Sequence, residues 1–339
     1  MTPVGIRGIA YHRPDGYMTA AEIAGLSGIP EHVLVDRFGL TGKHVSGPDE
    51  HVSDMAVSAA LDLFARESID PATIDAVVYF GSYWKDFEVW SASPHIAHRI
   101  GARNAFALEL INVSAGAPVG LKVVRDMIRS DERLHRVLMV AGCKEGSLLD
   151  YSNERARFMF NFGDGGVAVL LERGSRTNEV LESCLITDGR FALDVRVPAG
   201  GSVHPASHET VDRRMHHLDV RDPGEMKDAL DPITVPNFLH VATEAIERSG
   251  RSLDDLRFLV PIHFKRSLHD TLVAKLGLQP EQAWYLHDWG HMSALDPFIG
   301  LELAREAGRL TDGDLVCLLA AGTGYTWAAS CISWGNAPA

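Results

Sequence analysis

The sequence is poor in cysteine, in basic residues and in long apolar runs. It has four cysteines with no CxxC spacing, so neither a disulfide scaffold nor a zinc or redox motif is expected, and we predict buried, reduced thiols. No apolar run approaches the roughly 18 residues of a membrane helix, and the N-terminal segment lacks the charged-then-apolar pattern of a signal peptide. We therefore expect a soluble, cytoplasmic protein without a membrane partner. The cysteines are Cys143, Cys184, Cys317 and Cys331.

Acidic residues outnumber basic ones. The chain of 339 residues carries 45 Asp and Glu against 32 Lys and Arg, a formal net charge of −13. A surface of that sign repels phosphate backbones, so nucleic-acid binding is not expected. Hydrophobic residues make up 46%, as in an ordinary globular protein, and the length suggests two domains or one large one.

A long-range repeat is the strongest pattern in the chain. Two segments, each with an amphipathic helix, a polar loop and a β-rich apolar run, have counterparts about 180 residues further along the chain. This constant spacing favours an α/β fold built from two duplicated halves. Chance similarity between α/β segments is the alternative. The paired segments are 57–80 with 238–261, and 119–142 with 299–322.

Ser114 stands where an apolar run meets a helix. The run 106–113 predicts a strand, small residues follow the serine, and 119–130 predicts a helix. A nucleophile at such a turn would gain from the free N–H groups of the helix N-terminus, which can also stabilise an oxyanion. Taken alone, a serine before a helix is more often an N-cap.

Several segments together resemble the ketoacyl synthase III family of thiolase-fold enzymes, in family order and across almost the whole chain. The resemblance implies a five-layered αβαβα fold made of two similar halves, 1–175 and 176–339, and a homodimer. The segments are INVSAGAPVG (111–120), NFGDGGVAVLLE (161–172), FLVPIHFKRSLHDTLVAKLGL (258–278), WGHMSALDP (289–297) and AAGTGYTWAASCISW (320–334).

The chain departs from the Cys–His–Asn set that the family uses for decarboxylative condensation. Ser114 replaces the cysteine, Ile262 falls on the family's histidine with His263 displaced by one, and His291 replaces the asparagine. Thr323 replaces the middle glycine of the family's GGG turn, although its backbone N–H is retained.

These replacements predict a different catalytic set. A serine hydroxyl needs a base, and an imidazole can take and return its proton near neutral pH. We therefore expect Ser114 to attack a thioester, His291 to act as the general base and Asp296 to orient His291, with Asp288 as the second candidate. Backbone N–H groups of Ser114 and Thr323 would form the oxyanion hole.

Each residue also has a simpler interpretation. Ser114 could be an N-cap, an inactivating replacement or an engineered Cys→Ser change. The side chain of His291 could simply form a hydrogen bond within its own turn. Asp296 could be a first-turn carboxylate that favours the helix. His263 could be a polar neighbour, and Asp164 is expected to support its turn rather than to react.

The acyl donor is expected to be acyl-CoA or an acyl carrier protein, with no permanently bound cofactor and no metal. Arg37 stands where the family contacts the phosphates of coenzyme A, but Val33 replaces the tryptophan that stacks on the adenine. A carrier protein is acidic and needs a basic landing patch, for which solvated helix faces are the alternative. The candidates for that patch are Lys122, Arg125, Arg129, Lys265 and Arg266.

The sequence thus favours an acyltransferase that moves an acyl group to a hydroxyl, amine or carrier thiol in polyketide or antibiotic biosynthesis. The alternatives are a condensing ketosynthase that loads a starter unit, and a catalytically inactive partner subunit. An aromatic segment is expected to line the acyl pocket or to pack in the core. Its rings are Tyr83, Trp84, Phe87 and Trp90.

Overall fold

A nine-stranded mixed sheet is the framework of the protein in the computed structural model, which describes residues 2–336. The strand order is β11-β12-β13-β8-β1-β7-β6-β4-β5. The strands are β1 (Val4–His12), β4 (Ala76–Tyr79), β5 (Phe106–Glu109), β6 (Arg136–Cys143), β7 (Gly165–Arg173), β8 (Glu179–Thr187), β11 (Leu256–Pro261), β12 (Leu315–Gly322) and β13 (Thr326–Ser333).

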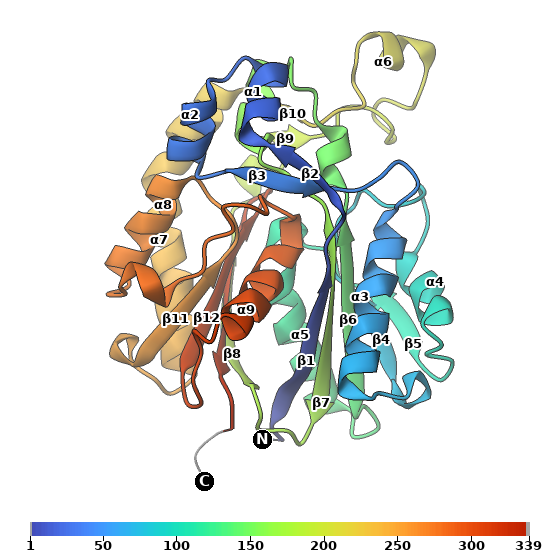
Figure 1. The fold of residues 1–339 in the computed structure, drawn as a ribbon, viewed down its shortest axis with the longest axis vertical. Helices are drawn as coiled ribbons and strands as arrows, with labels where there is room; N and C mark the ends of the chain where they lie inside the picture. The colour runs from blue at the N-terminus through green and yellow to red at the C-terminus, as the bar shows by residue number, and fades with distance from the viewer. Residues whose placement is uncertain (1, 337–339) are drawn as a thin grey trace.

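Helices divide this sheet into the expected layers (Figure 1). Strands β1 and β8 meet through a single residue pair, Gly5 with Glu179, so the sheet consists of two groups of strands. Helices α5 and α9 lie between the groups and contact strands of both, while α3 and α4 cover the outer face of one group and α7 covers that of the other. These helices are α3 (Val52–Glu67), α4 (Ala92–Arg99), α5 (Gly116–Ser130), α7 (Pro223–Arg248) and α9 (Asp296–Glu306).

Smaller elements cover the end of the sheet at which β6 and β12 finish (Figure 1). They bury a separate apolar cluster that includes Ile23, Leu34, Phe160 and Val220. The elements are β2 (Gly16–Thr19), α1 (Ala20–Ser27), α2 (Glu31–Val33), β3 (Gly42–Val45), β9 (Val195–Arg196), α6 (His208–Asp212) and β10 (Asp219–Val220). Helix α8 (Arg266–Lys275) instead lies beside α7 (Figure 1).

The predicted repeat corresponds to real elements. Segments 57–80 and 238–261 contain α3 with β4 and α7 with β11, while 119–142 and 299–322 contain α5 with β6 and α9 with β12. In each half the two strands of the repeat are parallel neighbours, β4 with β6 and β11 with β12. This is the arrangement that helix–strand alternation favours.

The predicted boundaries were less accurate. The apolar run 106–113 was predicted as one strand, but β5 ends at Glu109 because the chain turns towards α5, which begins at Gly116 rather than near residue 119. Helix α7 begins at Pro223, well before residue 238, because the Asp222 side chain caps its first N–H groups.

No helix in residues 2–336 combines the length and the hydropathy needed to cross a bilayer.

Candidate active site

Ser114 lies in a strained turn at the N-terminus of α5. The turn η3 (Val113–Ala115) connects β5 to the helix, and Val113 has a φ of 44°. A β-branched residue adopts this left-handed region only where the surrounding structure enforces it. The N-cap of α5 is Ala115, and no side chain caps the helix. The N-cap interpretation of Ser114 is therefore wrong, and its hydroxyl is available to another group.

A second turn of the same shape faces the first. Ser293, with a φ of 55°, occupies the matching position of the repeat in η9 (Ser293–Leu295), immediately before α9. The two turns pack so closely that a Cβ on Gly116 would lie 2.8 Å from the Cβ of Ala294 and 2.6 Å from the Phe80 carbonyl oxygen. The duplication thus brings the N-termini of two central helices together, one with Ser114 and the other with Asp296.

Ser114, His291 and Asp296 form a continuous hydrogen-bonded chain. The Ser114 Oγ lies 2.8 Å from His291 Nε2, and His291 Nδ1 lies 2.5 Å from Asp296 Oδ2. All three side chains are buried. The structure therefore brings together the three side chains that the sequence singled out.

The surroundings of Asp296 determine which nitrogen of His291 carries the proton. The carboxylate also accepts the backbone N–H of His263 at 2.8 Å and that of Met292 at 2.6 Å. With donors around it, Asp296 acts as an acceptor, so Nδ1 of His291 carries the proton and Nε2 is free to accept from Ser114. Burial by itself would lower the pKa of His291, but the charge of Asp296, its hydrogen bond and the charge of Glu145 raise it above the ordinary value.

The main chain of His291 is held by the segment after η5 (Glu154–Met159). The His291 N–H donates to the Asn161 carbonyl at 2.9 Å, and the Gly163 N–H donates to the His291 carbonyl at 3.0 Å. The Phe162 ring lies edge-on to the imidazole, with the ring centres 5.1 Å apart. His291 is therefore fixed by two backbone hydrogen bonds as well as by Asp296.

His263 is a polar neighbour and not a second base in contact with Ser114. Its Nδ1 accepts from Asn161 Nδ2 at 2.9 Å, its Nε2 has no partner among the described residues, and its ring is buried beside Tyr285. Burial lowers the pKa of His263 to about 4, so the ring is neutral near neutral pH. Its link to the site is its backbone N–H, which positions Asp296.

The backbone near Thr323 approaches the nucleophile turn. A Cβ on Gly322 would lie 2.7 Å from the Asn112 carbonyl oxygen and 3.3 Å from the Ser114 nitrogen. Thr323 follows in the half-buried turn between β12 and β13. The residue before Thr323 thus packs on the backbone of the turn that carries Ser114, and the oxyanion hole stays a prediction.

Other predicted residues are placed outside this chain of contacts. Asp288, the second candidate to orient the base, is half-exposed and lies 3.7 Å from His287 Nδ1, so that expectation was wrong. Asp164 supports its turn as expected, accepting the Ser46 N–H at 2.9 Å and the Ser46 hydroxyl at 2.8 Å. Arg37 is exposed in the π-helical turn η1 (Leu34–Phe38), next to half-buried Val33.

Part of the predicted basic patch is absent. Because α5 is a central helix, Arg125 is buried and binds Glu182 at 2.9 Å and the Leu181 carbonyl. Lys122 pairs with Asp126 and Arg129 with Glu182, so this face is neutralised and does not form a landing surface.

Three rings of the aromatic segment lie outside the core, while the half-buried Trp90 packs against a core cluster. Tyr83, Trp84 and Phe87 are among the exposed large side chains, and the Phe87 ring packs edge-on against Trp90.

All four cysteines are free and buried, as predicted. No group of three or more His, Cys, Asp or Glu in residues 2–336 is arranged to hold a metal ion.

Sequence reasoning missed two residues around the base, Asn161 and Glu145. Asn161 lies in segment 161–172, which resembles the family. Nothing in the sequence marked it as the residue that binds both His263 and the main chain of His291. Glu145 lies two residues after the end of an apolar strand. That was the available signal, because a charged residue at such a position is either exposed or held by a buried partner.

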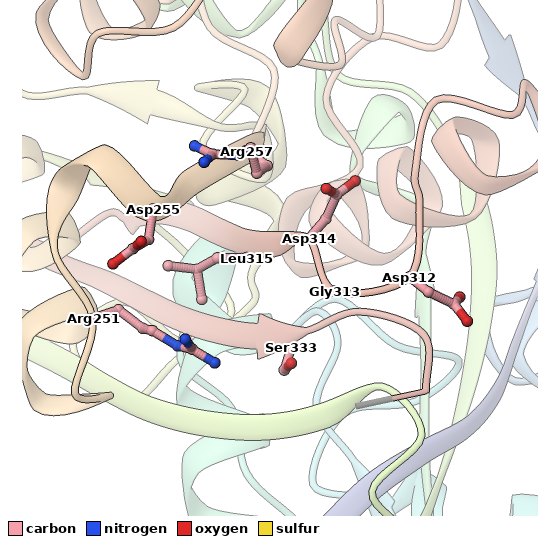
Figure 2. A pocket seen from close by; sticks show the side chains of 8 residues that line it. All are labelled: Arg251, Asp255, Arg257, Asp312, Gly313, Asp314, Leu315 and Ser333. Atoms are coloured by element: carbon pink, nitrogen blue, oxygen red, sulfur yellow. The ribbon is translucent and has the colours of Figure 1, made fainter. Parts of the chain in front are cut away.

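A surface hollow of about 270 Å³ is separate from this site (Figure 2). It lies at Leu315, where β12 begins, and at Ser333, where β13 ends, whereas the nucleophile turn packs on Gly322 at the other end of β12. Its charged side chains are of both signs, so it offers no preference for an anionic thioester. These side chains are Arg251, Asp255, Arg257, Asp312 and Asp314.

Known proteins share both the sequence pattern and the architecture. The family model for 3-oxoacyl-[acyl-carrier-protein] synthase III matches residues 108–189, and the model for the C-terminal part of that synthase matches residues 246–334. The β-ketoacyl-[acyl-carrier-protein] synthases III of Symbiobacterium thermophilum and Desulfitobacterium hafniense (strain DSM 10664 / DCB-2) are 28% and 26% identical. The alignments cover 98% and 99% of this chain and 99% of each relative.

The crystal structure of the synthase III from Thermus thermophilus superposes with a TM-score of 0.84 at 25% identity, over 98% of this chain and 100% of that one. Sequence models, relatives and three-dimensional similarity therefore agree along nearly the whole length. The chain belongs to the ketoacyl synthase III-like family of thiolase-fold, acyl-transferring proteins.

Proposed function

We propose that the protein is an acyltransferase that moves an acyl group from a thioester to Ser114 and then to a hydroxyl, an amine or a carrier thiol. The observation that carries the proposal is the chain of two hydrogen bonds, Ser114 to His291 at 2.8 Å and His291 to Asp296 at 2.5 Å. A nucleophile, a base and an orienting carboxylate in this order are the parts that serine-based acyl transfer needs.

In the first half of the reaction, Ser114 Oγ attacks the thioester carbonyl carbon and its proton passes to His291 Nε2. The negative charge on the carbonyl oxygen falls at the N-terminus of α5, where the backbone N–H groups of Ser114 and Thr323 are the proposed donors. The C–S bond then breaks, and the departing thiolate takes the proton from His291. The product of this half is an ester on Ser114.

In the second half, the acceptor attacks the ester. His291 Nε2 takes the proton of the acceptor, and returns it to Ser114 Oγ as the new acyl bond forms. Proton transfer of this kind accelerates a reaction by about 10²–10⁴-fold. Asp296 keeps the imidazole in the tautomer that both halves require.

For the donor we propose acyl-CoA or an acyl carrier protein. Exposed Arg37 supports contact with the phosphates that both donors carry. Exposed Lys265, just before α8, remains a candidate landing contact, whereas Arg266 pairs with Asp270 at 2.9 Å. Because the chain lacks the condensing set of the family, we place the reaction in polyketide or antibiotic biosynthesis rather than in chain elongation.

We also propose a homodimer. Strand β5 is at the edge of the nine-stranded sheet, and exposed Phe106 lies on it. The segment with exposed Tyr83 and Phe87 is tied to the same strand by an ion pair between Lys85 and Glu109 of 2.7 Å. An unpaired edge strand next to exposed aromatic rings is suited to pairing with a second copy.

Intact-mass spectrometry after incubation with an acyl-CoA tests the reaction. The native protein should gain the mass of one acyl group, and Ser114→Ala should gain none and lose transfer activity. Transfer by Ser114→Ala at the native rate would refute the role of Ser114. A native protein that gains no acyl adduct from any thioester and co-purifies with a second chain would instead support the inactive-partner alternative.

A condensing reaction is the second candidate, because the relatives are named β-ketoacyl synthases III. In that case malonyl thioester should release carbon dioxide and yield a β-keto product. We expect the acyl ester to form without carbon dioxide release, since neither Ile262 nor neutral, buried His263 replaces the condensing histidine.

A further inference from the structure

Glu145 is a buried carboxylate that the proposed reaction does not use. It begins the turn η4 (Glu145–Leu148), two residues after the end of β6, and only 9% of its surface is exposed. Its Oε1 accepts the Ser82 hydroxyl at 2.6 Å, and the Cys143 thiol lies 3.6 Å from its Oε2. No lysine or arginine in residues 2–336 forms an ion pair with it.

The short hydrogen bond from Ser82 favours the charged form of this carboxyl group. A separation of 2.6 Å lies within the range of about 2.5–2.7 Å for a hydroxyl donating to an ionised acceptor. A buried carboxylate without a basic partner is costly, because burial favours its neutral form. Some nearby group must therefore offset the charge.

The charge of His291 is one of the influences that lower the pKa of Glu145 against the effect of burial. Ser293, two residues after His291, is fully buried and lies close enough to Glu145 to contribute to its stabilisation. Cys143 Sγ is also 3.6 Å from the Gly163 carbonyl oxygen, and the Gly163 N–H donates to the His291 carbonyl at 3.0 Å. Glu145 is thus packed against both segments that hold the base.

The titratable groups around His291 can be named element by element. Asp296 faces it from α9 and Glu145 from η4, while His263, after β11, is neutral. Segment 161–163 and the turn with Ser114 bring no further ionisable side chain. Burial raises the pKa of Glu145, and Ser82 and His291 oppose that rise, while Asp296 and Glu145 raise the pKa of His291.

We propose that Glu145 is a positioning residue that acts through His291. Its carboxylate, together with that of Asp296, stabilises the imidazolium that forms when His291 takes the proton of Ser114. Asp296 orients the ring from the C-terminal half, and Glu145 adds a second negative charge from the N-terminal half. Only the catalytic consequence rests on the proposed function, because proton binding at His291 can be measured without any reaction.

The test is an NMR titration of histidine-labelled protein, with the His291 signal identified by its loss in His291→Gln. Glu145→Gln removes the charge at nearly constant volume, and the His291 midpoint should fall by about 0.5–1 pH unit, a three- to tenfold weaker proton affinity. If the protein transfers acyl groups, the acid limb of its pH–rate profile should move by the same amount. Ser82→Ala should produce a smaller fall, since it weakens the ionised form of Glu145.

Ser46→Ala is the matched control. It deletes a hydroxyl that donates to another buried carboxylate, Asp164, at 2.8 Å, and the His291 midpoint should stay at the native value. An unchanged midpoint in Glu145→Gln would overturn the proposal, and the carboxylate would then be a structural group of the core. If Glu145→Gln does not fold, an unchanged midpoint in Ser82→Ala has the same meaning. Failure of the proposed acyl transfer would appear in the acylation assays of the native protein and of Ser114→Ala. It would not alter the titration of His291.

Discussion

At the scale of single residues, the candidate site differs from the family pattern through exchanges whose effects depend on one another. A serine is less easily ionised than a cysteine, so a nucleophilic Ser114 would need a base, and His291 lies 2.8 Å from its hydroxyl. An imidazole in a buried place needs a carboxylate to fix its tautomer, and Asp296 lies 2.5 Å away. These three residues are best understood as one unit.

Asp296→Asn tests that unit. The asparagine keeps the volume but removes the negative charge. Its NH₂ group would face either the donors of His291 and His263 or that of Met292, so the imidazole would be held less firmly. We expect kcat/KM for acyl transfer to fall about 10²–10⁴-fold. Steady-state kinetics would measure the loss, with circular dichroism to verify folding. Asp288→Asn serves as the control and should retain native rates, and a comparable loss there would contradict the assignment.

The pH dependence follows from the raised pKa of His291. Acyl transfer requires neutral His291, so activity should fall as the pH drops through that pKa, and the acid limb of kcat/KM should lie above about 6.5. An acid limb near pH 4, where His263 titrates, would indicate that the wrong histidine was chosen.

The same shift has a consequence for stability, with the opposite dependence on pH. A histidine whose pKa is higher in the folded state binds its proton more tightly there, so its contribution is fully present below the pKa of the unfolded chain. That contribution is lost as the pH rises through the raised folded value. Removing His291 should therefore reduce the free energy of unfolding more at pH 5 than at pH 8, as urea titrations at the two pH values would show.

At the scale of elements, two helix N-termini define the site. The periodicity of the sequence predicted α5 and α9 as helices and β6 and β12 as strands, because apolar spacing reflects burial directly. The positive φ angles of Val113 and Ser293 had no such signal, since valine and serine do not favour that conformation. The packing of the two turns against each other imposes it.

Gly116→Ala probes this contact. A methyl group there would meet the Phe80 carbonyl oxygen at 2.6 Å and the Ala294 Cβ at 2.8 Å, so the turns must move apart. We expect the free energy of unfolding to fall by about 1–3 kcal/mol and acyl transfer to weaken with it. Chemical denaturation would measure the first effect and an acylation assay the second.

Gly25→Ala is the control at this scale. Gly25 is inside helix α1, and a Cβ there would meet nothing within 4 Å. Alanine is the better helix former, so this variant should be more stable by up to about 1 kcal/mol, with native activity. Equal destabilisation of both variants would contradict the argument from close packing.

At the scale of the whole molecule, duplication places the parts of the site in different halves. Ser114 comes from the first repeat, and His291 with Asp296 from the second. The central position of α5 also explains why Arg125, predicted as part of a basic patch, is instead buried against Glu182. Sequence pattern alone does not distinguish a solvated helix face from one that lies between two groups of strands.

The proposed dimer can be tested at the same scale. The monomer weighs 37.0 kDa, and light scattering after size exclusion should give twice that mass. Phe106→Glu adds a charge to the edge strand β5 and should shift the protein towards the monomer, because a buried, unpaired charge is costly. Leu26→Glu changes a side chain that is also exposed, on α1, and should leave the mass unchanged. A native protein that is already monomeric would rule out the dimer.

The sequence by itself determined the α/β class, the repeat and the family, because helix and strand periodicity and short motifs are local in the chain. It also singled out Ser114, His291 and Asp296 as candidates. Only the tertiary structure decided that these side chains meet, that Asp288 and the side chain of His263 do not join them, and that Glu145 lies beside the base. Those contacts join residues up to 177 positions apart, and their distances depend on how the two halves pack.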